Sequence, residues 1–303
     1  MSYPRVSIVT INYNQQALTC ALLESLRKLT YPDVEVIVVD NFSPHDPTET
    51  ITKNYPEAKY IRSSQNLGFA GGNNLGIQAS TGTYLMFLNN DTEVDSGFLE
   101  PMVALFETNS RAGAASSKIL YYNSDEIIQY AGSTCVNPFT GRNKRVGYME
   151  KDNGQHSTLK ETDLAHGAAM MVPRRVIEQT GMMPEFFFLY YEEIDWCESI
   201  KKAGYKIYFV PDSKVYHKES MSVGKNSTLK TYYMTRNRLL FMRRNTTGMK
   251  KLFWILFFVS FSLPKNTMTY LLQRDADHGK AFWKGLIWNL THLSNGQKMK
   301  LFT

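Results

Sequence analysis

Residues 83–91, with the sequence TYLMFLNND, form an apolar run that ends in two amides and a carboxylate. A short, nearly continuous apolar run is typical of a β-strand that is buried on both faces. Such strands occur in parallel sheets, where ligands bind at the carboxyl ends of the strands. The sequence therefore predicts that Asn89, Asn90 and Asp91 lie at a ligand-binding edge of a sheet.

Three similar segments precede this one: RVSIVTI at 5–11, VEVIVVD at 34–40 and AKYIRS at 58–63. Segments with the apolar spacing of helices separate them, at 17–29, 48–54 and 71–79. Two later segments, AGAASSKILYYN and LAHGAAMMVP, predict further strands. Strand–helix–strand units of this length form parallel sheets with right-handed crossovers. We therefore expect an α/β fold with a mainly parallel sheet flanked by helices.

All four early strands end in polar residues, which read TINYN, DNFS, QNLGFAGGNN and NND. Each end alone is also explained by the turn and cap preferences of Asn, Asp and Ser. Four such ends at one edge of a sheet favour a ligand site. The glycine-rich stretch at 68–76 lacks the GxGxxG pattern and follows the third strand, so it favours a nucleotide or phosphate over a dinucleotide.

Composition points to a folded intracellular protein. Of the 303 residues, 43% are hydrophobic and 20% are charged, which is ordinary for a globular chain. The three cysteines form no CxxC pair, which argues against a thiolate metal site and favours a reducing compartment. The N-terminal stretch does not resemble a secretory signal, so we expect a cytoplasmic location.

The net charge of +6 is unevenly distributed. From Lys218 onward the chain holds 15 Lys and Arg but 3 Asp and Glu, whereas the preceding part is acidic. Such asymmetry suggests an anionic partner for the C-terminal part. The sequence contains no recognised nucleic-acid-binding module, so we expect no nucleic-acid partner.

Five ordered motifs carry a family resemblance: VSIVTINYN, VIVVDNFS, NLGFAGGNNLGI, LMFLNNDTEVD and FFFLYYEEIDWCESIKKAGYKIYFVP. Together, across about residues 4–245, they resemble the inverting family 2 glycosyltransferases, in particular bacterial rhamnosyl- and galactofuranosyltransferase-like enzymes. The resemblance implies a GT-A fold with a single Rossmann-like sheet, a nucleotide-sugar donor and a divalent metal ion, Mn²⁺ or Mg²⁺. The expected donor is a UDP- or dTDP-sugar.

The resemblance also implies roles for individual residues. The donor-binding residues would be Thr10, Tyr13, Asn14, Asp40, Asn41, Asn66, Gly68, Asn73, Asn74 and Asn90, with Lys225 from a later loop a possible contact of the diphosphate. The DxD motif of the family corresponds to Asn89, Asn90 and Asp91, so Asp91 would bind the metal. The later histidine that completes the metal site corresponds to His217.

The acidic pair of the family corresponds to Glu192 and Glu193, and we expect Glu193 to be the general base. A carboxylate is needed there because the acceptor hydroxyl loses a proton as it attacks the sugar. Two residues depart from the family pattern: Glu193 stands where Asp is usual, and Asn89 replaces the first Asp of DxD. The first change moves the carboxylate by about 1 Å, and the second predicts weaker metal binding.

Residues near the acidic pair are candidates for acceptor binding: His166, Glu192, Asp195 and Trp196. Alternatives remain open for three of them. His166 would equally be a structural histidine, and Asp195 a helix N-terminal charge favoured by the macrodipole. The two glutamates would equally form a solvated first helical turn, although the preceding aromatic run FFFLYY favours an enclosed site.

The C-terminal part contains an apolar segment at 252–263, flanked by Arg243, Arg244, Lys250, Lys251 and Lys265. It is shorter than the ~20 residues that span a bilayer. It therefore predicts either a core helix or a segment that lies on anionic lipid. We expect a catalytic domain at 1–245, with a nucleotide-binding half to about 122 and an acceptor-binding half after it. A helical membrane-associating extension would follow at 246–303.

The resulting prediction is a metal-dependent inverting glycosyltransferase on the inner face of a bacterial plasma membrane. It would transfer a sugar to a surface polysaccharide or a lipid-linked glycan. Two alternatives stay open: a sugar nucleotidyltransferase, which would need a glycine-rich basic loop that NYNQQ at 12–16 lacks, and a nucleotide-sugar-binding scaffold with impaired catalysis.

Overall fold

The structure is a computed structural model that describes residues 3–218 and 227–292. A single sheet of ten strands forms its centre, in the order β3-β2-β1-β4-β9-β6-β10-β5, with β7 beside β6 and β8 beside β10. The strands are β1 (Val6–Asn12), β2 (Val34–Asp40), β3 (Lys59–Arg62), β4 (Tyr84–Asn89), β5 (Thr92–Val94), β6 (Ala112–Tyr121), β7 (Ile128–Tyr130), β8 (Lys160–Thr162), β9 (Ala169–Pro173) and β10 (Lys206–His217).

Strands β3, β2, β1 and β4 are parallel, as the sequence predicts, and β6 is parallel to β10. Strand β9 is antiparallel to both β4 and β6, which makes the sheet mixed. The register of the parallel strands pairs Asn12 with Asp40 and Ile11 with Asn89. The polar ends of β1, β2 and β4 therefore meet at one edge of the sheet.

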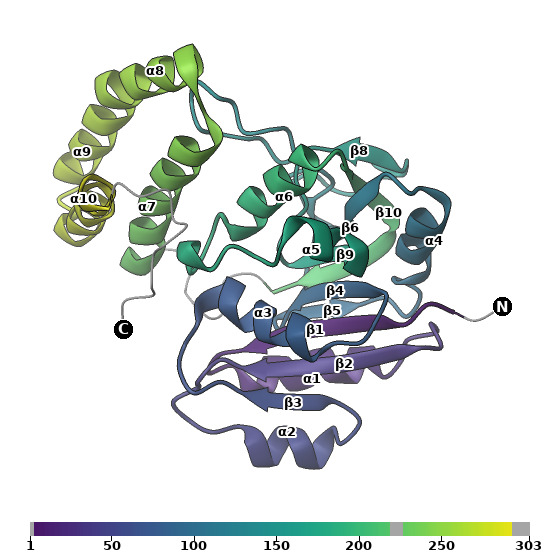
Figure 1. The fold of residues 1–303 in the computed structure, drawn as a ribbon. Coiled ribbons are helices and arrows are strands. Elements are labelled where there is room, and N and C mark those ends of the chain that lie inside the picture. The colour runs from purple at the N-terminus through teal and green to yellow at the C-terminus, as the bar shows by residue number, and fades with distance from the viewer. Residues whose placement is uncertain (1–2, 219–226, 293–303) are drawn as a thin grey trace.

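Helices pack on both faces of the sheet (Figure 1). Those of the first two thirds of the chain are α1 (Gln16–Leu26), α2 (Thr48–Asn54), α3 (Gly68–Ala79), α4 (Glu100–Thr108), α5 (Arg174–Thr180), the 3-10 turn η1 (Glu185–Phe187) and α6 (Glu192–Lys202). Strand β1 explains the layering, because Val6 and Ile8 belong to one hydrophobic cluster and Val9 to the other. Apolar side chains on both faces are what the uninterrupted apolar runs predict.

Gly76 lets α3 lie directly on β1. A Cβ atom at this position would overlap the Cγ1 atom of Val9, a side chain with no exposed surface. We expect Gly76→Ala to destabilise the protein by about 1–3 kcal/mol through overpacking, measured by thermal or urea unfolding. The control is Gly279→Ala in α10, where the nearest atom is 3.5 Å away. This control is expected to be neutral or stabilising, because alanine favours helix, and equal effects of the two variants would contradict the packing argument.

The C-terminal part is helical and lies beside the sheet (Figure 1). It comprises α7 (Thr228–Asn245), α8 (Gly248–Phe257), the π-helical turn η2 (Phe258–Ser262), α9 (Leu263–Leu272) and α10 (Ala276–Thr291). Helix α10 packs on α7, where Asn289 Nδ2 donates to the carbonyl oxygen of Arg236 at 2.9 Å. The predicted division at residue 245 falls at the end of α7 and stays a prediction.

The predicted apolar segment at 252–263 spans the junction of α8, η2 and α9. Its side chains are largely exposed: Leu252 by 48%, Phe253 by 50%, Leu256 by 53% and Phe261 by 66%. Only Trp254 and Ser262 are buried, so the segment is not a core helix. Among residues 3–218 and 227–292, no helix is both long enough and apolar enough to cross a bilayer.

Candidate active site

A buried hydrogen-bond network joins the ends of β1, β2 and β4. The Nδ2 atom of Asn12 donates to Asp40 Oδ1 at 2.7 Å, and Asn12 Oδ1 accepts from the Thr19 hydroxyl at 2.9 Å. The same hydroxyl accepts from Asn90 Nδ2 at 3.1 Å. Asn12 and Thr19 were not predicted as site residues, because no local pattern reveals which buried side chain will meet Asn90.

Asp40 is completely buried beneath this edge. Besides Asn12, its carboxylate accepts from the Ser43 hydroxyl, the Ser43 backbone N–H and Arg62, whose guanidinium lies 2.8 Å away. Asp40 therefore exposes no surface to a nucleotide base in this arrangement, and the expected base contact stays a prediction. With both oxygens occupied and no exposed surface, the carboxylate positions the loop after β2.

Exposed aromatic side chains follow strands β1 and β2 at this edge of the sheet. Tyr13 is 40% exposed after β1, and Phe42 is 50% exposed after β2. Phe42 (φ 66°) and Asn14 (φ 54°) adopt the left-handed conformation that non-glycine residues rarely take and that often marks a binding site. Phe42 was missed by the sequence analysis, although an aromatic residue directly after a strand-ending Asp-Asn was a usable signal. Thr10 is fully buried within β1, and its hydroxyl has no hydrogen-bond partner.

Asn41 holds the loop before α3. Its Nδ2 atom donates to the Asn66 Oδ1 atom and the Gly68 carbonyl oxygen, and its Oδ1 atom accepts from Leu67 N–H. Gly68 (φ +70°) has no room for a side chain, because a Cβ atom would overlap the Phe188 carbonyl group. The glycine therefore brings this loop against the aromatic segment that precedes α6.

Asn73 and Asn74 are buried on α3. Asn74 donates to the Met183 carbonyl oxygen at 2.9 Å and to Glu185 Oε1 at 2.7 Å, and it accepts from Met183 N–H at 3.0 Å. Its amide is used within the protein, and the predicted donor contact of Asn74 stays a prediction. Asn73 donates within α3, to the Phe69 carbonyl oxygen. Lys225 lies outside the described residues.

Asp91 and His217, distant in sequence, meet at the end of the sheet. The Asp91 Oδ1 and His217 Nε2 atoms are 3.0 Å apart, and both side chains are almost completely buried. On the other side of the ring, His217 Nδ1 lies 2.7 Å from the Oε1 atom of Gln129, a buried residue of β7. An amide oxygen only accepts, so this contact places a proton on Nδ1 and directs Nε2 toward Asp91.

This arrangement suits a divalent cation. The histidine nitrogen and the carboxylate oxygen lie 3.0 Å apart, and either a proton on Nε2 or a cation bound by both atoms would satisfy the pair. The Asn89 Oδ1 atom beside them is buried and without a partner, and its amide nitrogen lies 3.4 Å from His217 Nε2. An outer hydrogen bond such as that of Gln129 is typical of histidine ligands. The described residues offer no cluster of three or more His, Cys, Asp or Glu side chains, so further ligands would come from elsewhere.

The acidic pair begins α6 and is held by an unusual backbone. Tyr190 and Tyr191 both have positive φ, at 68° and 77°. The Asn237 side chain on α7 donates to three carbonyl oxygens between residues 187 and 190, at 2.8–2.9 Å. Helix α7 therefore supports the strained turn that orients Glu192 and Glu193, and Asn237 was not predicted from the sequence.

Both glutamates are short of hydrogen-bond partners. Glu192 is buried, Glu193 is half-buried, and the Oε2 atom of each has no partner. Burial raises the pKa of Glu193, and burial together with the charge of Glu193 raises the pKa of Glu192 well above its usual range. Carboxyl groups with raised pKa values in a cleft are typical of general acid–base sites.

The raised pKa of Glu192 predicts a pH-dependent gain from Glu192→Gln. A group whose pKa is higher in the folded protein favours folding at low pH, and that contribution is lost as pH rises through the folded pKa. We therefore expect this variant to raise the melting temperature by a few degrees at pH 8, with the gain disappearing below the ordinary glutamate pKa of 4.5. Glu198→Gln, on the same helix, is the control, and an equal gain at both pH values would contradict burial as the cause.

The His166–Gly167 turn links the two halves of the site. The rings of His166 and His217 lie 6.3 Å apart, and a Cβ atom on Gly167 would touch Glu193 at 3.5 Å. Desolvation, followed by the charge of His217, lowers the pKa of His166 to about 3. Its Nδ1 atom accepts from Ala168 N–H, so the neutral ring carries its proton on Nε2. His166 thus lies next to His217, and its acceptor-binding role stays a prediction.

Two predicted acceptor residues lie elsewhere. Asp195 is buried, and its carboxylate accepts from Asn245 Nδ2 at 2.7 Å and pairs with Arg244 at 3.3 Å. Trp196 is 1% exposed, packs edge-on against Phe87 and donates to the Gly181 carbonyl oxygen. In this structure Asp195 joins α6 to α7 and Trp196 is part of the core, and their acceptor-binding roles stay predictions.

The sequence pattern described as glycosyl transferase family 2 matches residues 7–181. The chain belongs to this family. It is a glycosyltransferase, as the resemblance implies, and its fold is the GT-A fold. The metal ion, the donor and the acceptor remain proposals.

Curated relatives carry related names. The hexosyltransferase Agl10 of low-salt glycan biosynthesis in Haloferax volcanii is 27% identical over 240 residues, 78% of this chain and 74% of the relative. The dTDP-rhamnosyl transferase RfbF of Shigella flexneri is 26% identical over 252 residues, 78% of this chain and 79% of the relative. The N-acetylglucosaminyl-diphospho-decaprenol L-rhamnosyltransferase of Mycobacterium tuberculosis is 23% identical, across 72% of this chain and 78% of the relative.

Solved structures support the fold. GalNAc-T7 with UDP, GalNAc and Mn²⁺ matches with a TM-score of 0.67 and 19% identity, across 95% of this chain and 57% of the other. The mannosyltransferase PcManGT of Pyrobaculum calidifontis with GDP-Man and Mn²⁺ matches with a TM-score of 0.57 and 16% identity, across 97% of this chain and 77% of the other. At these identities the likeness concerns the fold.

Proposed function

We propose that this glycosyltransferase is metal-dependent and inverting, and that its donor is a UDP- or dTDP-sugar. The observation that carries the proposal is that two chemically distinct centres lie on either side of one short turn. Asp91 and His217 form a cation-binding pair, and the His166–Gly167 turn separates them from the unpartnered Glu193 carboxylate. The dTDP-rhamnosyl transferase among the relatives and the UDP and Mn²⁺ in GalNAc-T7 support the choice of donor and ion.

Each centre has a separate task. A bound divalent cation supplies positive charge where the leaving diphosphate becomes more negative. Asp91 and His217 would hold that cation, with Asn89 Oδ1 beside them. Glu193 would accept the proton of the acceptor hydroxyl, because its raised pKa makes it a stronger base than an exposed glutamate. Attack on the face opposite the leaving group then inverts the anomeric centre.

The donor nucleotide would lie above the polar edge of β1, β2 and β4. The exposed rings of Tyr13 and Phe42 offer stacking surfaces for a base, and the fixed loop around Asn66 and Gly68 closes the far side. Asp40 and the Asn12–Thr19–Asn90 network would support this surface from below. This distribution is an alternative to the direct base contact expected of Asp40.

The test is product analysis with purified protein, Mn²⁺ and a panel of nucleotide sugars. Release of nucleoside diphosphate and an inverted anomeric configuration, read by NMR, are expected. Release of nucleoside triphosphate on addition of pyrophosphate would favour the sugar nucleotidyltransferase alternative. Donor binding without turnover on any acceptor would favour the catalytically impaired scaffold.

We further propose a lipid-linked glycan as acceptor and a peripheral position on the cytoplasmic face of an anionic membrane. The exposed apolar side chains of α8, η2 and α9 support this position, as do Lys250, Lys251 and Lys265 beside them. Apolar side chains that enter the lipid interface, together with basic groups that meet anionic headgroups, are features of interfacial helices. The relative that acts on a decaprenol-linked sugar is consistent with such an acceptor.

The double substitution Phe253→Asp and Leu256→Asp is expected to reduce binding to phosphatidylglycerol vesicles by at least about tenfold, because both side chains are half exposed and each would bury apolar area in lipid. Co-sedimentation with vesicles measures the effect. Leu159→Asp, at an equally exposed leucine near β8, is the control. Unchanged sedimentation of the double variant would contradict the membrane position.

A further inference from the structure

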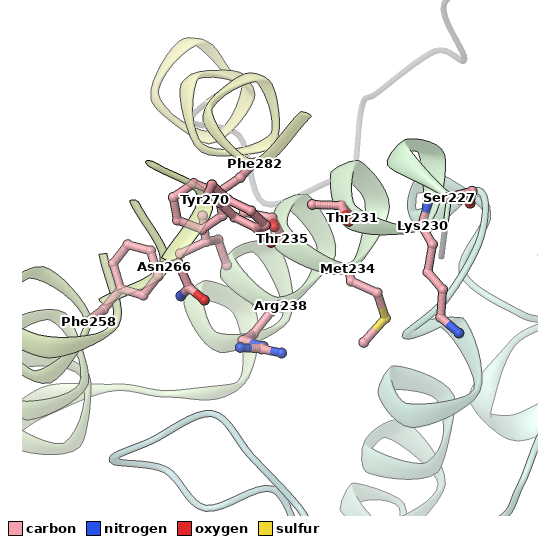
Figure 2. A pocket seen from close by; sticks show the side chains of 11 residues that line it. Ser227, Lys230, Thr231, Met234, Thr235, Arg238, Phe258, Asn266, Tyr270 and Phe282 are labelled. Atoms are coloured by element: carbon pink, nitrogen blue, oxygen red, sulfur yellow. Dashed lines mark hydrogen bonds between the residues drawn. The ribbon is translucent and has the colours of Figure 1, made fainter. Parts of the chain in front are cut away.

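A pocket of about 270 Å³ lies between α7 and the helices that follow it (Figure 2). One face of α7 forms its floor, with Lys230, Met234 and Arg238 spaced at intervals of four residues. Phe258, Asn266, Tyr270 and Phe282 close it from η2, α9 and α10. Its volume is close to the lower end of the range for small-molecule sites. None of the roles discussed above uses this pocket.

The pocket has a cationic side and an aromatic side. Figure 2 shows the rings of Tyr270 and Phe282 together and Phe258 to one side of them, with the charged end of Lys230 well away from these rings. No acidic residue is among the lining residues. Within the described part of the chain, no carboxylate pairs with either cation. Such a combination suits an amphipathic anion: the cations would meet phosphate oxygens, and the rings would meet hydrocarbon.

The pocket also lies between the catalytic carboxylates and the exposed apolar surface. The Arg238 Nε atom is 3.2 Å from the hydroxyl oxygen of Tyr191, and Tyr191 directly precedes Glu192. On the other side, Phe258 belongs to η2, the π-helical turn that carries the exposed Val259 and Phe261. The order from site to surface is therefore carboxylate, cation, aromatic ring and exposed apolar side chain.

We propose that this pocket binds the phosphate-bearing end of the lipid carrier to which the acceptor sugar is attached. This inference rests on the proposed function and adds where the acceptor binds and which chemical groups bind it. Lys230 and Arg238 would bind the diphosphate, and Tyr270, Phe258 and Phe282 would contact the first carbons of the lipid. The sugar on the other side of the diphosphate would then point toward Glu193. The donor diphosphate would occupy the separate Asp91–His217 centre.

The test is calorimetric titration of the full chain with farnesyl diphosphate, a soluble prenyl diphosphate. Binding is expected, and the double variant Lys230→Gln and Arg238→Gln is expected to weaken it at least tenfold. Arg238→Lys should retain most of the affinity, because it keeps the positive charge. This variant tests whether the glutamine substitutions weaken binding merely by disturbing the fold. Lys280→Gln is the matched control, because Lys280 lies on α10 outside the pocket and is 80% exposed.

Two results would overturn the inference. One is equal affinity of the double variant and the native protein for farnesyl diphosphate, or no binding to either. The other is binding of inorganic pyrophosphate as tight as that of farnesyl diphosphate, which would show that the hydrocarbon chain contributes nothing to binding. Manganese-dependent binding of UDP or dTDP, measured on the same proteins, separates these failures from failure of the proposed function. The double variant is expected to leave nucleotide binding unchanged.

Discussion

Glu193→Gln is expected to lower the rate of sugar transfer by about 10²–10⁴-fold, the usual contribution of a positioned general base. The amide has the size of the carboxylate but cannot accept the proton of the acceptor hydroxyl. Because Glu193 is separated from the Asp91–His217 centre by the His166–Gly167 turn, donor affinity should be unchanged. The measurement combines initial rates with calorimetric binding of the nucleoside diphosphate in the presence of Mn²⁺.

Two variants sharpen this experiment. Glu198→Gln removes a carboxylate from the same helix, where Glu198 pairs with Lys201 at 2.7 Å, and should leave the rate unchanged. Glu193→Asp restores the residue usual in the family and shifts the carboxylate by about 1 Å, so it should retain part of the activity. A native rate for Glu193→Gln with intact donor binding would show that another group removes the proton.

The pH profile tests the same assignment in another way. Glu193 acts as a base only when it is deprotonated, and burial raises its pKa above the usual 4.5. The rate should therefore fall as pH decreases through this raised value, at a higher pH than an exposed glutamate would give. In Glu193→Gln the residual rate should lose this acid limb. The steepness of the limb also depends on Glu192, because two interacting carboxyl groups titrate together.

The central sheet was predictable because its strands are buried on both faces. Strands β1, β2 and β4 read as continuous apolar runs, and α2 has the bounds that its pattern predicts. The polar ends follow from the same reasoning, since parallel register brings Asn12, Asp40 and Asn89 to one edge. The local sequence pattern predicts this part of the site because its residues lie at the ends of successive strands.

Local pattern did not reveal which partner each polar side chain has in the folded protein. Asp195 lies two residues after Glu193, and side chains two apart on a helix point to nearly opposite sides, so Asp195 meets Asn245 on α7. Asn74 belongs to the same motif as Gly68, yet its amide is used by Met183. Gln129 and Asn237 were missed because their partners are distant in sequence and come close only in the fold. No local spacing indicates these contacts.

Asp91→Asn and His217→Ala are each expected to reduce Mn²⁺-dependent binding of the nucleoside diphosphate by at least about 100-fold. The protein offers few ligands here, because the described residues hold no cluster of three or more His, Cys, Asp or Glu side chains. Loss of either one leaves only the other member of the pair and Asn89 as candidate ligands among the described residues. Free Mn²⁺, measured by electron paramagnetic resonance during titration with UDP, reports the effect directly and does not depend on turnover.

The controls follow from the geometry of the His217 ring. Asp125→Asn removes an 83% exposed carboxylate and should leave Mn²⁺ binding unchanged. Gln129→Met keeps the size of the side chain but removes the Oε1 atom, which lies 2.7 Å from His217 Nδ1 and accepts its hydrogen bond. Outer partners of this kind are worth about 10–100-fold in metal affinity, so this variant should fall between the control and His217→Ala. Native Mn²⁺ binding by both Asp91→Asn and His217→Ala would mean that the cation is held elsewhere. An intermediate effect of Gln129→Met would show that the His217 ring must be held with its Nε2 lone pair toward the cation.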